Sequence, residues 1–253
     1  MHITDTFVKT PNLPSGKVTL AAVSGIYKEL PDALAEYGIE SILTESDPRL
    51  QVPVAHHADM QLFHVGENRT FVLSGEKALK EQLERNGFLV AETAQEPHAE
   101  YPGDVLCNAL YLGNTVFANL GSMDANICMA LDAMGARTIH VNQGYAHCTT
   151  AVLNDHAIIT MDSGIYAAAQ FFGIDVLLIP ERAILLEGHD YGFIGGCCGL
   201  IDKNVLAFTG RLDSLNCVNQ IRAFLDKHNI TTVELTQNQM LDIGGIIPLK
   251  QAF

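Results

Sequence analysis

Apolar residues recur at helical spacing in five stretches of the chain, at residues 26–37, 76–86, 125–134, 165–172 and 214–228. Glycine follows four of these stretches directly, at positions 38, 87, 135 and 173, and Asn229 follows the fifth. Glycine and asparagine adopt the left-handed backbone conformation that closes a helix more readily than other residues do. The pattern therefore predicts five helices with well-marked ends.

A short β-rich run follows each predicted helix, at residues 39–43, 88–90, 137–141, 174–179 and 230–235. After a polar loop come two further runs joined by a tight turn, at residues 67–69, 113–114, 154–155 and 202–204. The chain thus repeats a unit of helix, strand, loop and hairpin with a period in the mid-forties.

The fifth unit lacks its last hairpin strand, because the chain ends soon after residues 244–247. Residues 16–25 are similar to the second hairpin strand of the other units and share their Ser-Gly ending. We expect residues 17–23 to pair with residues 246–249, which would close a ring and remove the free sheet edges. The prediction is one α/β domain over residues 1–253, a propeller of five repeats.

A doubly wound parallel sheet is the competing fold, because helices alternate with strands there too. That fold does not need a hairpin after every strand. The sequence also contains neither of the glycine-rich phosphate loops that such sheets often carry.

Composition and charge narrow the function. Of 253 residues, 48% are hydrophobic and 17% charged, which indicates a folded globule. Lysine and arginine number 15 against 29 acidic residues, which gives a net charge of −14. We therefore expect no nucleic-acid or membrane partner, whereas a small cation would be attracted to the protein. Residues 1–5 lack the start of a signal peptide and no apolar run reaches about 20 residues, which predicts a cytoplasmic protein. The six cysteines form no CxxC pair, so free thiols are expected.

Local motifs give a resemblance to a known superfamily. Residues 101–106 with the hairpin at 113–117, and residues 147–153, look like segments of the penteins, the guanidino-group-modifying proteins. These include arginine deiminase, dimethylargininase and glycine amidinotransferase, together with the non-catalytic translation initiation factor six. The resemblance implies the five-repeat propeller, a small guanidino-like ligand, and a catalytic histidine at His147. It also implies substrate-binding acids near Asp59.

The fifth repeat departs from this family. Its enzymes attack the guanidinium carbon with a cysteine in a glycine-rich segment near the C-terminus, but residues 241–249 contain no cysteine. Tyr101 also replaces the acid that opens the second-repeat motif. Standard guanidino hydrolysis therefore lacks its usual nucleophile, and Cys197 or Cys198 is the remaining candidate for a relocated one.

Superposing the repeats on their closing glycines brings Asp59, Asp104 and His147 to one level, with residues 195–197 and Asp242 near it. Equivalent positions in a ring converge on its axis. The acids could hold a guanidinium by charge-assisted hydrogen bonds, with Asp59, Asp104 and Asp242 as substrate-binding residues. Each acid could instead cap a turn, and His147 could be a buried structural histidine.

The cysteines and histidines could also have structural roles rather than catalytic or metal-binding ones. Cys148 follows His147, so on a strand it would face the opposite side and belong to the core. Cys197 and Cys198, set among glycines, could be small core residues rather than a nucleophile or a soft-metal site. The histidines show no recognised metal spacing, and we expect neither a metal nor a cofactor.

Two hypotheses remain from the sequence. The first is hydrolysis or transfer at a guanidino-like or amide-like carbon, with His147 as acid and base, Asp104 as its partner and Cys197 or Cys198 as nucleophile. The second is a non-catalytic binding or interaction scaffold of the same fold. The oligomeric state stays open.

Overall fold

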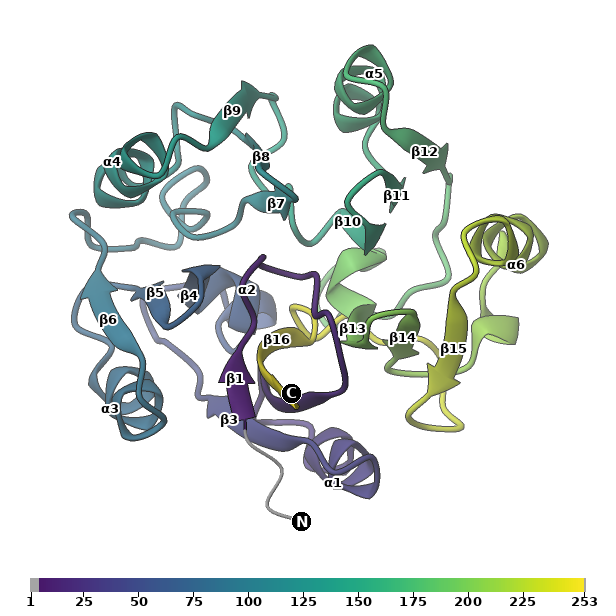
Figure 1. Ribbon diagram of the computed structural model, residues 1–253, viewed down its shortest axis with the longest axis horizontal. Coiled ribbons are helices and arrows are strands. Elements are labelled where there is room, and N and C mark those ends of the chain that lie inside the picture. The colour runs from purple at the N-terminus through teal and green to yellow at the C-terminus, as the bar shows by residue number, and fades with distance from the viewer. Residues whose placement is uncertain (1–4, 253) are drawn as a thin grey trace.

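The computed structural model describes residues 5–252 and contains five small sheets set around a common centre, with the main helices on the rim (Figure 1). Residues 1–4, part of the segment used above to predict the absence of a signal peptide, and residue 253 lie outside the described residues. No helix within residues 5–252 is both long and apolar enough to span a bilayer.

Four sheets share one strand order, a hairpin followed by a third strand parallel to the second hairpin strand. They are β4 (Leu62–Gly66), β5 (Arg69–Val72) and β6 (Leu89–Glu92); β7 (Leu110–Leu112), β8 (Thr115–Ala118) and β9 (Arg137–His140); β10 (Thr150–Asn154), β11 (Ala157–Thr160) and β12 (Asp175–Leu178); and β13 (Cys198–Asp202), β14 (Val205–Phe208) and β15 (Thr231–Glu234). A helix joins the hairpin to the third strand in each, namely α3 (Lys77–Arg85), α4 (Ala125–Ala133), α5 (Ser163–Phe171) and α6 (Val218–Lys227). The predicted repeat of helix, strand and hairpin is thus present.

The remaining sheet joins the two ends of the described chain. It has the order β1 (Asp5–Phe7), β16 (Ile247–Ala252), β2 (Val18–Ser24) and β3 (Glu40–Thr44), and α1 (Glu29–Glu36) connects β2 to β3. Strand β2 pairs with β16 in antiparallel fashion, with Ala22 opposite Ile247, as the sequence predicts. Strand β1, which the sequence analysis does not predict, covers the other edge of β16.

The helix ends follow the predicted glycine signals more closely than the helix starts do. Gly38, Gly87, Gly135, Gly173 and Asn229 all have positive φ, between 54° and 86°. The largest differences at helix starts are at α1, which begins at Glu29 rather than residue 26, and at α6, which begins at Val218 rather than residue 214. Helix α3 begins one residue later and α5 two residues earlier than predicted. Residues 212–214 form a separate 3₁₀ turn, after which Leu215 is extended, so the helix can begin only beyond it.

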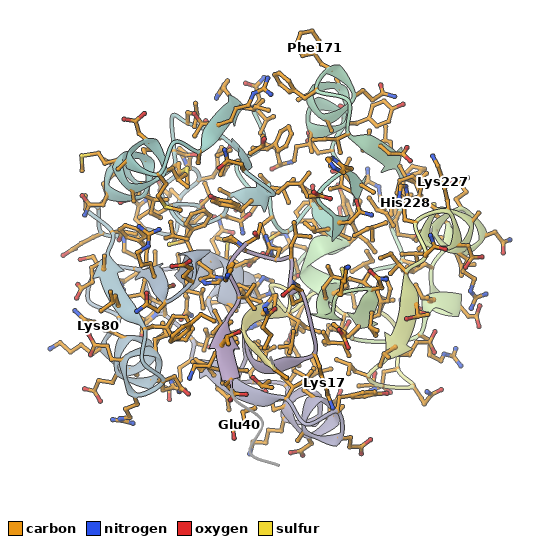
Figure 2. The ribbon with its side chains drawn as sticks, in the orientation of Figure 1. Lys17, Glu40, Lys80, Phe171, Lys227 and His228 are labelled. Atoms are coloured by element: carbon orange, nitrogen blue, oxygen red, sulfur yellow. The ribbon has the colours of Figure 1, made fainter. Side chains whose placement is uncertain are left out.

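Side chains are more buried on the hairpin strands than on the third strands of the sheets. The hairpin strands are buried almost throughout, whereas β6 and β15, the third strands of their sheets, alternate or expose their side chains. Phe117 and Phe208, on the middle strands β8 and β14, are wholly buried. Charged and large exposed side chains such as Lys80, Phe171 and Lys227 lie on the rim (Figure 2). The short helix α2 (Ala58–Gln61) lies near the centre (Figure 1), and 3₁₀ turns at Val52–Val54 and Gly195–Cys197 also precede hairpins in the chain.

The pairing of β16 with β2 makes a stability prediction. Leu249 on β16 is wholly buried against Leu20 and Ala22 of β2. We expect Leu249→Ala to lower the free energy of unfolding by about 2–5 kcal/mol, as other leucine truncations in cores do. Glu40→Ala, on the exposed face of β3 in the same sheet, should change it by less than about 0.5 kcal/mol. Denaturant titration of both variants measures the difference, and equal midpoints would show that β16 does not contribute to the core.

A buried histidine should make the fold sensitive to mild acid. Burial lowers the pKa of His64 to about 4, while its Nε2 lies 2.9 Å from the carbonyl oxygen of Glu67. The unfolded chain takes up this proton near pH 6.5 and the folded chain only near pH 4, so stability is present above pH 6.5 and is lost as the pH falls from 6.5 to 4. We expect His64→Gln to flatten the slope of unfolding free energy against pH in this window by up to about 1.4 kcal/mol per pH unit. The exposed His156→Gln should leave the slope unchanged.

Candidate functional site

Asp59 accepts hydrogen bonds from two side chains of another repeat. It lies in the first turn of α2, is 2% exposed, and its Oδ2 is 3.0 Å from Nδ1 of His147 and 2.7 Å from Sγ of Cys148. Its other carboxylate oxygen is buried and has no partner within residues 5–252. The structure therefore brings together two of the residues predicted from the sequence, Asp59 and His147.

Cys148 does not face away from His147 as expected. The two residues lie in a turn over residues 146–149, before β10 begins, rather than on a strand with alternating sides. Cys148 is buried and packs in a core cluster, as expected, but its thiol also donates to Asp59. The prediction that Cys148 points away from His147 was therefore wrong, since both side chains contact Asp59. The prediction that Cys148 is buried was correct.

Asn108 holds this turn in place, and the sequence analysis missed it. Its side-chain oxygen accepts from the backbone N–H of His147 at 3.0 Å, and its Nδ2 donates to Sγ of Cys148 at 3.1 Å and to the carbonyl of Asp59 at 3.3 Å. Asn108 is the one polar residue in the apolar run 105–110. A buried amide needs several partners, so that isolated polarity was the available signal.

Asp242 is a second buried carboxylate. Its Oδ2 accepts from the backbone N–H of Phe193 at 2.8 Å and its Oδ1 from that of Gly244 at 3.1 Å. Burial raises the pKa of Asp242 to about 7; the negative charge of Asp59 acts in the same direction, and the two backbone bonds oppose both. No lysine or arginine within residues 5–252 forms an ion pair with either carboxylate.

His57 lies between the two carboxylates. Its Nδ1 is 3.8 Å from Oδ1 of Asp242, and potential ligand atoms of His57, Asp59 and Cys148 all lie within 4.8 Å of one another. Burial lowers the pKa of His57 to about 4, so the ring is neutral near pH 7. Within residues 5–252 neither ring nitrogen has a hydrogen-bond partner. His57 lies two residues before the predicted Asp59, but the sequence analysis gave it no role.

Two glycines make this packing possible. A Cβ at Gly196 would lie 1.8 Å from Oδ1 of Asp242, and one at Gly244 would lie 2.3 Å from Cβ of His57. Gly244 also has φ of 78°. The glycines of the fourth and fifth repeats are therefore required for close approach of the chain to the central side chains.

Asp104 is separated from Asp59, His57 and Asp242 by Tyr145. It is fully buried and accepts a hydrogen bond from the hydroxyl of Tyr145, and within residues 5–252 no hydrogen bond joins it to His147. Burial raises the pKa of Asp104, and burial together with Asp104 raises the pKa of Tyr145. Tyr145 also lines the cavity described below, so Asp104 contacts the cavity wall only through this tyrosine.

Cys197 and Cys198 are buried with their thiols directed at the backbone. Their Sγ atoms donate to the carbonyl oxygens of Phe193 at 3.1 Å and Ile194 at 3.3 Å. Burial raises the pKa of both thiols, which disfavours the thiolate that a nucleophile needs. Neither thiol hydrogen-bonds to the central acids.

A cavity of about 240 Å³ opens beside these side chains. Its polar lining consists of His57, Cys148, His189, Asp190 and Asp242, and its aromatic lining of Tyr145, Tyr191 and Phe193. The ring of Phe193 lies 6.3 Å from that of Tyr145 and 5.9 Å from that of Tyr191. His147 and Asp59 instead line a small hollow of about 20 Å³ beside Asn12. Of the three predicted acids, Asp59 and Asp242 lie near His57, Asp104 lies behind Tyr145, and only Asp242 lines the larger cavity.

Solved structures of guanidino-modifying enzymes share this fold. The inosamine-phosphate amidinotransferase of Streptomyces griseus matches with a TM-score of 0.61 at 9% identity, covering 94% of each chain. The agmatine deiminase of C. jejuni, with substrate bound, matches with a TM-score of 0.55 at 10% identity, covering 94% of this chain and 95% of the other. The DDAH of Pseudomonas aeruginosa, complexed with citrulline, gives 0.53 at 12% identity over 94% and 100%. The predicted pentein fold is confirmed.

Sequence comparison identifies the family of the chain but no activity. No curated protein matches the sequence significantly. Residues 22–247, most of the chain, match the profile described as "Family of unknown function (DUF6873)". The chain therefore belongs to the DUF6873 family and has the fold of the guanidino-group-modifying enzymes.

Proposed function

We propose that the protein binds a small organic cation with a guanidino or amidino group in the cavity beside Asp242. The observation that carries this proposal is a fully buried carboxylate on the cavity wall with no lysine or arginine partner within residues 5–252. Burying a carboxylate without a positive partner is costly, and a cation entering the cavity would offset that cost. The same cation would favour the ionised form of Asp242.

The rest of the cavity wall suits a planar cation. Tyr145 and Phe193 supply aromatic rings, to which a guanidinium is attracted by the ring quadrupole. Tyr191 already holds a guanidinium in this way, since Cζ of Arg182 lies 3.7 Å from its ring centroid. Asp190 adds a second acid to the lining. A guanidinium also offers paired N–H donors that match a carboxylate, so Asp242 could hold it by two parallel bonds.

Proteins of this fold give the ligand class independent support. The C. jejuni enzyme acts on agmatine by name, and the P. aeruginosa enzyme was solved with citrulline. The net charge of −14 would raise the local concentration of a cationic ligand. Six free cysteines are consistent with the cytoplasmic location we also propose.

Catalysis at the guanidino carbon is the second candidate, and the pair of His147 and Asp59 favours it. A carboxylate 3.0 Å from Nδ1 fixes the ring so that the other nitrogen can exchange protons, as in many general acid and base sites. In this candidate Asp59, rather than Asp104, orients His147. Cys197 and Cys198 are poor nucleophiles because their thiols are protonated and bonded to the backbone.

Binding is tested by isothermal titration with agmatine in the presence of a metal chelator. We expect Asp242→Asn to weaken binding by about 1.5–3 kcal/mol, since it removes a hydrogen bond to a charged group. Asp155→Asn, an exposed acid in the β10–β11 turn, is the matched control and should bind like the unmodified protein. Equal affinity of the two variants would exclude Asp242 as the ligand's partner.

Turnover separates the two candidates. We expect no citrulline from arginine or dimethylarginine and no ureido product from agmatine, because residues 241–249 carry no cysteine. Product formation that falls by about 100-fold or more in His147→Ala would establish catalysis instead. If that activity persists in the Cys197→Ser, Cys198→Ser double variant, neither of these thiols is the nucleophile.

A further inference from the structure

Organic-cation binding beside Asp242 does not explain the surroundings of the His57 imidazole. The ring is wholly buried, yet neither nitrogen has a hydrogen-bond partner within residues 5–252. Buried polar side chains are nearly always paired, because an unpaired donor or acceptor costs about 1–3 kcal/mol. One oxygen of Asp59 next to it is buried and unpartnered as well. Two buried groups with free lone pairs at one place can together bind an electrophile such as a metal ion.

The neighbouring groups have the chemistry of metal ligands. An imidazole nitrogen, a carboxylate oxygen and a thiol sulfur, from His57, Asp59 and Cys148, lie within 4.8 Å of one another. Zinc and its neighbours in the first transition series accept this mixed set, whereas calcium and magnesium prefer oxygen alone.

We propose that His57, Asp59 and Cys148 form a binding site for a divalent transition-metal ion of the zinc type. The ion takes one nitrogen of His57, one oxygen of Asp59 and the sulfur of Cys148. The Cys148 thiol donates a hydrogen bond to Asp59, with 2.7 Å between sulfur and oxygen. Metal binding replaces that S–H···O bond: the thiol proton leaves to solvent, and sulfur and oxygen both turn to the ion.

Surrounding residues already hold two of the three ligands. Asn108 donates to the sulfur of Cys148, and His147 hydrogen-bonds to the carboxylate of Asp59. Such outer contacts orient metal ligands and usually change affinity 10–100-fold when removed. His57 and Cys148 both line the cavity of about 240 Å³, which gives an ion access and leaves room for water as a fourth ligand.

This site goes beyond the proposed function, since it uses different side chains from those that would hold the organic cation. The ion needs His57, Asp59 and Cys148, whereas the guanidino group needs Asp242 and the aromatic wall. Agmatine binding is measured with a chelator present and metal binding with no agmatine present. One proposal can therefore fail while the other stands.

The test is titration of the full-length, reduced, chelator-treated protein with Co²⁺, followed by competition with Zn²⁺. We expect one ion per chain, visible d–d absorption of low-symmetry cobalt and a near-ultraviolet sulfur-to-cobalt charge-transfer band. Cys148→Ser should abolish the charge-transfer band and weaken binding by more than about 100-fold, beyond the range for an outer contact. Cys198→Ser, which removes an equally buried thiol that bonds only to the backbone, should retain both.

Several results would overturn the proposal. They are the absence of cobalt binding, a bound ion without the sulfur band, or the same loss in Cys148→Ser and Cys198→Ser. If Cys148→Ser fails to fold, X-ray absorption at the zinc edge of the unmodified protein decides the matter. A sulfur scatterer near 2.3 Å with nitrogen and oxygen near 2.0–2.2 Å supports the site, and a shell of oxygen and nitrogen alone rejects it.

Discussion

The carboxyl-bearing residue Asp59 joins four repeats at the centre of the molecule. Its backbone N–H donates to the carbonyl of Gly244, its own carbonyl accepts from Asn108, and its carboxylate accepts from His147 and Cys148. These partners come from three other repeats, with His147 and Cys148 in the same turn, and the repeat of Asp59 itself is the fourth. In a buried network of this kind the groups depend on one another, because the loss of one partner leaves others unpaired in a medium of low dielectric constant. The positions of the turn at 146–149 and of the glycine segment near 244 are therefore coupled through one side chain.

The electrostatics of the centre follow from the same packing. Asp59 and Asp242 are buried near each other without a lysine or arginine partner in the described chain. Backbone N–H groups donate to Asp242, side chains of His147 and Cys148 hydrogen-bond to Asp59, and a neutral His57 lies between the two acids. Backbone dipoles reduce the cost of a buried carboxylate but do not remove its charge. Burial raises the pKa of Asp242 to about 7, so protonation of Asp242 avoids part of this cost near neutral pH.

The sequence predicted the repeating frame well because that frame is set by local and periodic signals. Closing glycines mark helix ends through φ alone, and the shared Ser-Gly ending was enough to pair residues 17–23 with the last strand. The site depended on non-local packing, which no period reveals. Asn108 and His57 acquire their roles only from side chains distant in sequence. The predicted direction of the Cys148 side chain was wrong because the alternation of a strand was applied to residues that form a turn. Asp104 does not reach the central group directly, since Tyr145 lies between them.

The fifth repeat explains why this centre differs from that of the family it resembles. Gly244 and Gly245 both have positive φ, near 78°, and bring the backbone directly against His57 and His147. A Cβ at Gly245 would lie 3.1 Å from Cε1 of His147, and one at Gly244 would overlap His57. Ile246 and Ile247, which follow, are buried in apolar clusters. A thiol-bearing side chain therefore has no room where the backbone meets the histidines. The histidine of the third repeat instead shares Asp59 with the thiol of Cys148, its neighbour in the chain.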